Sequence, residues 1–405
     1  MKQIKLHTLV LMVGPSGAGK STAIKNLFNE TEVVSSDSIR ASMLGDFQIQ
    51  ANLPDVWDEV FRRVKLMLGF GQRVVVDATN LRTRDRTQFI DVAKQFGVDL
   101  VYVVVNRPVE QKLATAGWRT AYLINKHEEL FNNNLKNIMS GDGVATVVTY
   151  DVDKIEVVQH VNSPNKNDAE WFSKGVTVIG DVHGNLVDLQ HILHDADMNS
   201  RNVLFLGDII DYGDSNLDVM DVVYRRICNG TARMIWGNHE RKMNRWVDSN
   251  FGQDFKGTVT FGMSKTLDEI DAAMAINPMF KQKFIARWRM LHSNSRQHVV
   301  YNDHLFTHGA ATVDMWNMQG HSLNGIHSNL AFFGEVDEKT PALEDGYPNR
   351  IYKWVDAIPA GKTVVVGHDP RDKAVPYEVT NKMGGRAIFL DTGSSKGGKL
   401  SCINL

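Results

Sequence analysis

The chain has 405 residues, a formal net charge of −2, and 43% hydrophobic against 23% charged residues. This is the composition of an ordinary globular protein, and at about 150 residues per domain the length predicts two or three domains. The charge argues against extensive nonspecific binding of nucleic acid, because residues 1–160 carry 19 lysines and arginines against 18 aspartates and glutamates.

The sequence contains no membrane segment and no disulfide framework. No apolar run reaches the length of about 18 residues that a membrane-spanning helix requires. The two cysteines, Cys228 and Cys402, are too few for a set of disulfides or for a zinc ribbon. The simplest interpretation is a protein of the reducing cytoplasm, or of the host cytoplasm if a phage encodes it.

Two runs of alternating strand and helix signals divide the chain. Apolar segments predict buried parallel strands in the first run at 7–13, 73–76 and 100–105, and in the second at 176–179, 203–206 and 232–236. A polar segment with a Ser-Pro-Asn sequence separates the two runs. We therefore predict an α/β protein with a first domain at 1–160, a linker at 161–174 and a second domain at 175–405.

The first predicted strand leads into a glycine-rich loop. The sequence GPSGAGKS at 14–21 matches G-x-x-x-x-G-K-[ST] at every fixed position, between a predicted strand and a predicted helix. In such a loop backbone N–H groups face phosphate oxygens, the lysine reaches the β- and γ-phosphates, and the serine can ligate Mg²⁺. The loop predicts binding of ATP or another NTP with Mg²⁺ through Gly14, Ser16, Gly17, Ala18, Gly19, Lys20, Ser21 and Thr22.

Polar residues also follow the later strands of the first half. In SSDSIR at 35–40, Asp37 could accept a proton from an attacking hydroxyl and Arg40 could hold a phosphate. Alternatively, Ser36 or Asp37 only caps the next helix. In VVDATN at 75–80, Asp77 is either a metal partner or an ordinary carboxylate at a strand end.

Four arginines of the first half have two interpretations each. Arg82, Arg84 and Arg86 either line a path for a polynucleotide or form a solvated helix face. Arg119 is placed either to close over phosphates as a lid or to lie on the surface.

The motifs GPSGAGKST, SSDSIR and VVDATN, in this order, resemble those of the P-loop 5′-hydroxyl polynucleotide kinases over about residues 8–140. The resemblance implies a parallel sheet with helices on both faces. It also implies that Asp37 is the general base toward the 5′-hydroxyl, that Arg40 contacts the substrate phosphate, and that Arg119 clamps the NTP. Bacterial members usually carry a second lid arginine, whose position falls on Thr115 here.

The second half carries five short motifs, each directly after an apolar run: GDVHGN at 180–185, GDIID at 207–211, GNHE at 237–240, THG at 307–309 and GHD at 367–369. Strand ends of one sheet converge, so the polar residues of these motifs should meet. Their oxygen and nitrogen donors suit Mn²⁺, Fe or Zn²⁺. A pair of such metals can activate water for attack on phosphorus.

This order of motifs resembles the calcineurin-like metallophosphoesterases over about residues 175–405, in the branch with bacterial phosphoprotein phosphatases and dinucleoside tetraphosphatases. The resemblance implies an α/β sandwich and two divalent metals, with Mn²⁺ expected and Ni²⁺, Fe or Zn²⁺ as alternatives. It implies that His239 acts on the leaving oxygen and that Asp211 orients it. The implied metal ligands are Asp181, His183, Asp208 as the bridge, Asn238, His308 and His368.

One position departs from the pattern of that family. Many relatives read GDxxDRG, with an arginine that binds the substrate phosphate, whereas this chain has Tyr212 at that place. A tyrosine cannot supply a bidentate cation. Phosphate binding would then rely on another arginine, or the preferred substrate would be a diester or a cyclic phosphate.

Together the two halves resemble the bacterial and phage polynucleotide kinase-phosphatases that heal broken RNA ends. The resemblance implies phosphorylation of 5′-hydroxyl ends and removal of 3′-, 2′- or 2′,3′-cyclic phosphates from RNA or DNA. A separate ligase is the expected partner, with no membrane involvement and with homo-oligomerisation left open. The alternatives are a small-molecule kinase fused to a nucleotide phosphatase, and a phosphoprotein phosphatase with an NTP-sensing P-loop domain.

Overall fold

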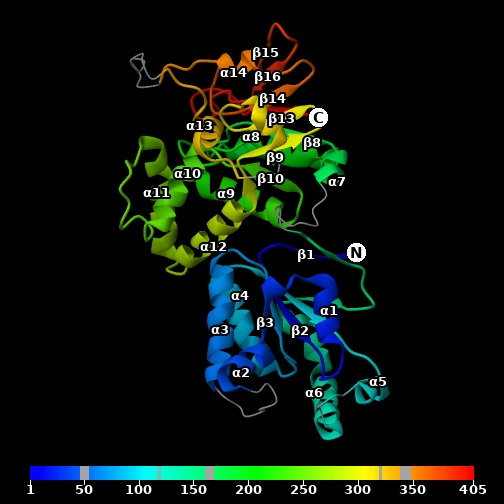
Figure 1. Cartoon of the computed structure of the whole chain (residues 1–405). Coiled ribbons are helices and arrows are strands. Elements are labelled where there is room, and N and C mark those ends of the chain that lie inside the picture. The colour runs from blue at the N-terminus through cyan, green and yellow to red at the C-terminus, as the bar shows by residue number, and fades with distance from the viewer. Residues whose placement is uncertain (46–53, 116, 118–119, 160–167, 319–321, 338–347) are drawn as a thin grey trace. The chain divides into compact units, whose positions relative to one another are not determined.

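The computed structural model describes the chain except residues 46–53, 116, 118–119, 160–167, 319–321 and 338–347. The chain forms two compact units (Figure 1): Met1–Val158 with Met279–Met290, and Gln159–Pro278 with Leu291–Leu405. The sequence places Met279–Met290 in the second half. The structure assigns it to the first unit, because Ala286 packs in the first unit's core and Gln282 hydrogen-bonds Gln95.

The first unit is built on a parallel sheet in the order β3-β4-β2-β5-β6. Its strands are β2 (Thr8–Val13), β3 (Val33–Ser35), β4 (Val74–Asp77), β5 (Asp99–Val104) and β6 (Thr146–Thr149). A separate parallel pair joins β1 (Lys2–Ile4) to β7 (Ile155–Val157). Its helices are α1 (Lys20–Leu27), α2 (Ser36–Leu44), α3 (Pro54–Gly69), α4 (Thr83–Phe96), α5 (Val109–Ala114) and α6 (Ala121–Met139).

Helices cover both faces of this sheet. Along β2, Leu9 and Leu11 enter one core cluster while Val10 and Met12 enter another, as the period of two in a strand requires. The first cluster receives apolar residues of α3 and α4, and the second receives those of α1. In α3 the buried residues recur every four positions, at Val56, Val60, Val64 and Leu68. The predicted parallel sheet with helices on both faces is confirmed.

The second unit contains two five-stranded sheets. The first has the order β11-β10-β9-β8-β17, with β8 (Val176–Ile179), β9 (Asn202–Phe205), β10 (Ala232–Ile235), β11 (Ser295–Arg296) and β17 (Cys402–Asn404). The second has the order β12-β13-β14-β16-β15, with β12 (His298–Tyr301), β13 (His304–Thr307), β14 (Thr363–Val366), β15 (Tyr377–Thr380) and β16 (Arg386–Phe389).

A shared apolar core lies between these sheets. Val178 and Leu204 from one sheet and Phe306 and Val365 from the other belong to the same buried cluster, which confirms the predicted sandwich. The helices of the second unit are α7 (Asp168–Ser173), α8 (Leu186–Met198), α9 (Asn216–Cys228), α10 (Asn238–Asp248), α11 (Phe261–Ile276), α13 (Gly325–Phe333) and α14 (Lys353–Asp356). Most of α12 (Phe280–Ser293) belongs to the first unit. Within the described residues, none of the helices combines the length and the apolar character needed to cross a membrane.

The stability of the first unit should depend on pH through His7, which is buried with Nε2 3.0 Å from the carbonyl oxygen of Leu68. Burial lowers its pKa to about 4, against the opposing effect of this hydrogen bond. The unfolded chain takes up the proton near pH 6.5. The stabilisation is therefore complete above about pH 6.5 and is lost as the pH falls toward about 4, by about 3 kcal/mol in the free energy of unfolding.

Urea unfolding of wild type and His7→Gln at about pH 7.5 and 4.5 tests this expectation, because glutamine keeps a donor for Leu68 but does not titrate in this range. The wild type should lose about 2 kcal/mol more than the variant over this interval. Equal losses in the two proteins would contradict it.

Candidate active sites

The phosphate-binding motif of the first unit forms the expected strand, loop and helix. The loop leaves β2 at Val13, and the N–H of Gly14 donates to the carbonyl oxygen of Thr79 at 3.1 Å. A Cβ on Gly14 would lie 2.0 Å from the carbonyl oxygen of Val105, so a side chain cannot fit there. Gly17 and Gly19 have φ of 77° and 103°, a region that favours glycine. These conformations let the loop curl before α1 begins at Lys20.

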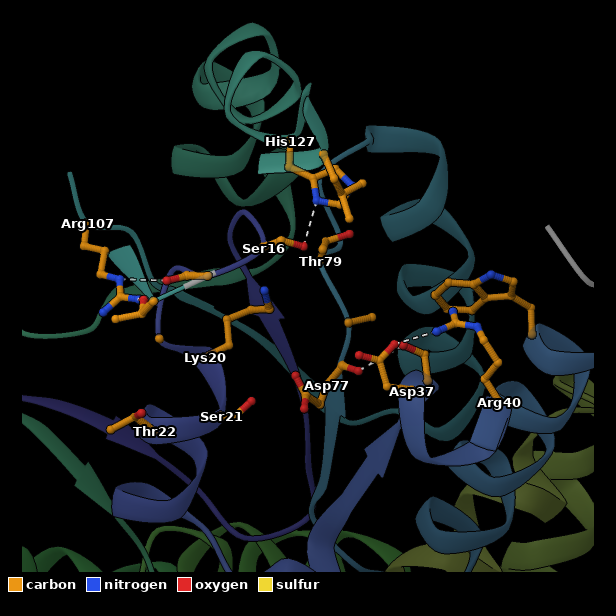
Figure 2. A pocket seen from close by; sticks show the side chains of 17 residues that line it. Ser16, Lys20, Ser21, Thr22, Asp37, Arg40, Asp77, Thr79, Arg107 and His127 are labelled. Atoms are coloured by element: carbon orange, nitrogen blue, oxygen red, sulfur yellow. Dashed lines mark hydrogen bonds and ion pairs between the residues drawn. The ribbon is translucent and has the colours of Figure 1, made fainter. Parts of the chain in front are cut away.

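A cavity of about 480 Å³ lies at the carboxyl ends of β2, β3 and β4. Figure 2 shows Lys20, Ser21 and Asp77 directed into the same space. The ammonium of Lys20 donates to the carbonyl oxygens of Gly14 and Pro15 at 2.9 and 3.0 Å. The lining residues are Ser16, Gly17, Gly19, Lys20, Ser21, Thr22, Ser36, Asp37, Arg40, Trp57, Asp77, Ala78, Thr79, Arg107, Thr115, Leu123 and His127.

Asp37 and Arg40 lie on α2 at the opposite side of this cavity from the phosphate-binding loop (Figure 2). Arg40 donates to the carboxylate of Asp37 at 2.6 Å. The residue that caps α2 is Ser35, whose Oγ accepts from the N–H of Ser38 at 3.3 Å. The alternative that Ser36 or Asp37 serves only as the cap is therefore wrong, and the half-exposed carboxylate of Asp37 is available to a ligand in the cavity.

Two residues that the motif analysis missed also line the cavity. His127 of α6 lies with Nδ1 2.9 Å from Oγ of Ser16, and Arg107 donates through Nε to the carbonyl oxygen of Gly17 at 2.7 Å. Arg107 also donates to the hydroxyl of Thr115, the position at which the resemblance predicts a second lid arginine. Arg119, the predicted lid arginine, lies outside the described residues.

Of the three neighbouring arginines, Arg86 fits neither interpretation, because its side chain is buried. The side chain of Arg86 is fully buried and pairs with Asp142 at 2.6 Å, so its charge serves the core of the first unit. Arg84 is exposed and lies 3.4 Å from Asp85, and Arg82 precedes α4 as its cap residue. None of these three lines the described cavity.

In the second unit, the loops after five strands bring the predicted ligands together. Asp181 and His183 follow β8, and Asp208 follows β9, as the motifs predict. Two groups of side chains place their ligand atoms within 4.8 Å of one another: His183, Asp208 and His239 in one, and Asp208, His308 and His368 in the other. Asp208 belongs to both groups, which is the placement that a bridging carboxylate requires.

Backbone hydrogen bonds orient the imidazoles. Nδ1 of His183 lies 2.8 Å from the carbonyl oxygen of Ile210, and Nδ1 of His308 lies 2.9 Å from that of Leu206. These contacts assign the proton to Nδ1 in both rings, because a carbonyl oxygen can only accept. The Nε2 atoms then face Asp208, at 3.9 Å for His183 and 3.3 Å for His308.

The remaining predicted ligands meet the same group. Oδ1 of Asn238 lies 3.0 Å from Nε2 of His308, and Nδ1 of His368 lies 3.1 Å from it. The carboxylate of Asp181 accepts from the N–H of His368 at 2.9 and 3.0 Å. Five residues in and beside this cluster have a positive φ, which costs energy for residues other than glycine. They are His183, Asp208, Asp211, Tyr212 and His368.

Buried carboxylates explain why cations fit here. Asp181, Asp208, Glu240 and Asp391 are all buried. Burial, reinforced by Asp391 and Asp208, raises the pKa of Asp181 well above its usual range. Burial would also raise the pKa of Asp208, but His308 and His239 outweigh it and bring this pKa well below the usual range. A divalent cation would offset the burial and the carboxylate repulsion that raise the pKa of Asp181, and the oxygen and nitrogen donors are those that divalent transition metals prefer.

Glu240 holds the loop that carries Asp208, a role that the sequence did not reveal. Its carboxylate accepts from the N–H groups of Asp208, Ile209 and Gly237 at 2.8, 2.9 and 2.9 Å. A Cβ on Gly237 would lie 2.0 Å from Oδ1 of Asp208, so the backbone approaches this carboxylate more closely than a side chain would allow.

His239 and Asp211 form the predicted pair. Nδ1 of His239 lies 2.6 Å from Oδ2 of Asp211, whose other oxygen accepts from the hydroxyl of Thr266 at 2.6 Å. Burial lowers the pKa of His239, but Asp208 and Asp211 outweigh it and raise the pKa to about 9. The imidazole therefore holds a proton at neutral pH, as an acid for a leaving oxygen must.

Tyr212 stands where many relatives have an arginine, and Arg350 supplies a guanidinium near the same cluster. The Tyr212 ring meets the ring of His183 edge-on at 5.1 Å between centroids, and the ammonium of Lys396 lies 4.6 Å from the Tyr212 ring centre. Arg350, which no motif singled out, places Nη2 2.8 Å from Nε2 of His368. A guanidinium thus borders the ligand cluster from a different part of the chain.

Comparisons with known proteins agree with this division. Residues 9–121 match a family described as an AAA domain, and residues 175–389 match the calcineurin-like phosphoesterase family. A bis(5′-nucleosyl)-tetraphosphatase PrpE (asymmetrical) of Bacillus cereus (strain AH187) is 25% identical over 237 residues, which cover 55% of this chain and 87% of that protein.

Two solved structures are similar to more than half of the chain. A metallophosphoesterase from Sphaerobacter thermophilus is 17% identical, covers 56% of this chain and 83% of its own, and has a TM-score of 0.32. A cold-active protein-tyrosine phosphatase of a psychrophilic Shewanella is also 17% identical, covers 57% and 75% respectively, and has a TM-score of 0.35.

Proposed function

The chain belongs to the calcineurin-like phosphoesterase family, and from this premise we propose that it is a bifunctional enzyme that heals nucleic-acid ends, RNA above all. It phosphorylates 5′-hydroxyl ends with ATP and Mg²⁺, and it removes 3′-, 2′- or 2′,3′-cyclic phosphates. The observation that carries the proposal is the cavity of the first unit, which holds a phosphate-binding loop and the carboxylate of Asp37 in one space. A kinase needs both a phosphate cradle and a base for the acceptor hydroxyl.

In the first unit each side chain has a separate task. Lys20 and the loop N–H groups hold the phosphates of ATP, and Ser21 ligates Mg²⁺. Asp37 accepts the proton of the attacking 5′-hydroxyl, and Arg40 holds both this carboxylate and the phosphate on the acceptor's other side. Arg119 remains the proposed lid, and Arg107 borders the cavity beside the loop.

In the second unit the chain's own groups position the ester and handle the proton. Divalent metals, with Mn²⁺ the first choice, would be held by Asp181, His183, Asp208, Asn238, His308 and His368, and they would supply Lewis-acid activation of the phosphoester. Arg350 holds a phosphate oxygen in place of the arginine that Tyr212 replaces. As a water oxygen bonds to phosphorus and the bond from phosphorus to the ribose oxygen breaks, His239 gives its proton to that ribose oxygen, and Asp211 keeps the imidazole oriented.

The cellular setting follows from the same chemistry. Repaired ends with a 5′-phosphate and a free 3′-hydroxyl are substrates for joining, so we propose a separate ligase as the next enzyme. Cys228 and Cys402 are not joined in a disulfide, and we propose the reducing cytoplasm as the location.

A second candidate function is a small-molecule kinase fused to a nucleotide phosphatase. The relative that favours it is named as a dinucleoside tetraphosphatase. A single assay separates the two candidates. The protein is incubated with radiolabelled ATP and 5′-hydroxyl RNA, and phosphate release is measured from RNA with a 2′,3′-cyclic end and from a dinucleoside tetraphosphate. Label on the RNA and release from the cyclic end support end healing, whereas activity on the tetraphosphate alone would contradict it.

Replacing Asp37 by asparagine should lower phosphoryl transfer to 5′-hydroxyl RNA by about 10²-fold or more, which is the usual scale for a lost general base. Asparagine keeps the size and a hydrogen bond to Arg40 but cannot take up the proton. ATP binding should be unchanged, since the phosphate-binding loop is untouched. The measurement is the single-turnover rate together with the Kd for ATP. Unchanged transfer would show that Asp37 is not the base.

A further inference from the structure

A cavity of about 500 Å³ in the second unit has no part in the chemistry described above, apart from one shared residue. It lies between the segment that leads into α14, the loop after β14, and strands β15 and β16. Its volume falls within the range of about 300–1,000 Å³ typical of small-molecule sites. The lining residues are Arg350, Ile351, Tyr352, Lys353, Val355, Asp356, Arg371, Tyr377, Val379 and Phe389.

The walls of this cavity are flat and carry π surfaces. The guanidinium of Arg371 lies 4.0 Å from the ring centre of Tyr352 and 5.1 Å from that of Tyr377. Phe389 and Val355 are buried core residues and form an apolar floor. Aromatic rings and guanidinium planes are the surfaces on which nucleobases stack, with little demand for base-specific hydrogen bonds.

Arg350 links this cavity to the metal-ligand cluster. Arg350 lines it and also places Nη2 2.8 Å from Nε2 of His368. Tyr352 lines it and donates through its hydroxyl to Asp369, the residue after His368, at 2.6 Å. A ligand whose ring lies in the cavity can therefore offer a phosphate to Arg350 without leaving it.

The charge of the lining suits a phosphorylated ligand. Arg350, Lys353 and Arg371 are cationic, and Asp356 is the acidic residue among the lining side chains of the described cavity. Burial, with the hydrogen bond to Asp369, raises the pKa of Tyr352 to about 12, so its phenol stays neutral and remains a donor. Positive charge beside an apolar floor matches a flat apolar ring joined to an anion.

We propose that this cavity binds the nucleobase of the nucleotide whose phosphoester is hydrolysed, with Tyr377 and Arg371 as the stacking surfaces. The inference rests on the proposed hydrolysis of nucleic-acid 3′-phosphates and names how that substrate is recognised. Stacking works for every base, so the site accepts all four nucleotides and selects against phosphates that carry no aromatic ring.

The test compares the full-length, Mn²⁺-loaded protein with Tyr377→Leu and Arg371→Ala. Adenosine 3′-monophosphate and glycerol 2-phosphate serve as substrates, because only the first carries a base. Loss of one stacking partner should raise KM for adenosine 3′-monophosphate about tenfold, within the range that base stacking supports. For Tyr377→Leu the kcat should stay unchanged, as should both constants for glycerol 2-phosphate, and Tyr377→Phe should behave as the wild type. Arg371→Ala also removes a cation, so it should raise KM for both substrates, but more for adenosine 3′-monophosphate than for glycerol 2-phosphate.

A matched control is Lys362→Ala, which removes a cation 5.2 Å from the ring centre of Trp316 elsewhere in the same unit. It should leave both substrates unaffected. Binding is measured separately by calorimetry with the phosphonate analogue of adenosine 3′-monophosphate, in which a methylene group replaces the ester oxygen. Tyr377→Leu should weaken this binding by the same factor of about ten.

The outcomes separate this inference from the proposed function. Analogue binding that Tyr377→Leu and Arg371→Ala leave unchanged would overturn the nucleobase site. So would equal losses on both substrates, or a tyrosine-phosphate peptide that is hydrolysed with the same dependence on Tyr377. If the analogue binds through these residues but neither phosphate is released, the nucleobase site stands and the proposed hydrolysis fails.

Discussion

Asp208→Ala should abolish phosphoester hydrolysis, with a loss of about 10³-fold or more, and should strip bound metal from the second unit. Asp208 is the side chain common to both groups of ligand atoms, so its removal disturbs both at once. Metal ions contribute several kcal/mol to such reactions, which corresponds to at least this loss in rate. The measurements are phosphate release from p-nitrophenyl phosphate and metal content after dialysis.

Folding of this variant can be checked independently. Glu240 anchors the same loop through the N–H groups of residues 208, 209 and 237, so the backbone should keep its conformation without the Asp208 side chain. The circular dichroism spectrum should match that of the wild type. His368→Ala touches one group of ligand atoms and should lose less metal. Full activity of a metal-free Asp208→Ala protein would refute the metal site.

His239→Ala provides the contrast that separates a proton donor from a ligand. Demand for a proton grows with the basicity of the leaving oxygen, so the variant should slow release from a ribose hydroxyl far more than from p-nitrophenol. Asp211→Asn should show the same pattern more weakly, because Asp211 only orients the ring at 2.6 Å. Since Nε2 of His239 lies 3.8 Å from Asp208, equal losses on both substrates with lost metal would make His239 a ligand instead.

Lys20→Ala should reduce phosphoryl transfer by about 10³-fold. Losses of this size are typical when an enzyme loses one preorganised donor that stabilises the charge of the transition state. Hydrolysis of p-nitrophenyl phosphate should be unaffected, because the P-loop belongs to the first unit and the ligand cluster to the second. The experiment measures both activities on the same preparation, together with the Kd for ATP.

The control for Lys20→Ala is Lys25→Ala, which removes a lysine from the last turn of the same helix, away from the cavity lining. It should keep both activities. Loss of both activities in a folded Lys20→Ala protein would mean that the two reactions share one composite site.

Much of the candidate chemistry is local in sequence and was therefore predictable. Gly17, Gly19 and Lys20 belong to one loop whose glycines are required by its own backbone angles. Asp181, Asp208 and Asn238 follow parallel strands β8, β9 and β10 of one sheet, so their convergence at one edge was predictable. His308 and His368 follow β13 and β14 of the other sheet, and only the packing of the two sheets brings them to the same place. The parallel P-loop sheet was predictable from its apolar strands, whereas the sandwich was predicted from the resemblance to the metallophosphoesterase family.

Other features depend on contacts between distant segments and carry no local signal. Arg86 has the spacing of a surface helix residue, yet Asp142 meets it 56 positions later and makes it a core residue. Glu240 follows the GNH motif, and nothing in the local sequence indicates a role for it. In the fold its carboxylate accepts a hydrogen bond from the N–H of Asp208. The sequence predicted that Met279–Met290 belongs to the second domain. In the structure Ala286 packs in the apolar core of the first unit, so the segment belongs there.

The sequence by itself determined the two chemistries: a phosphate cradle with Lys20, and a set of aspartates and histidines that can hold metals. Only the tertiary structure decided what surrounds them, such as Arg350 beside His368 and the aromatic cavity behind it. The physical reason is that the conformation of a ligand loop depends mainly on its own few residues. A pocket wall forms instead where separate elements pack against each other, and the residue spacing within one element does not indicate which element it packs against.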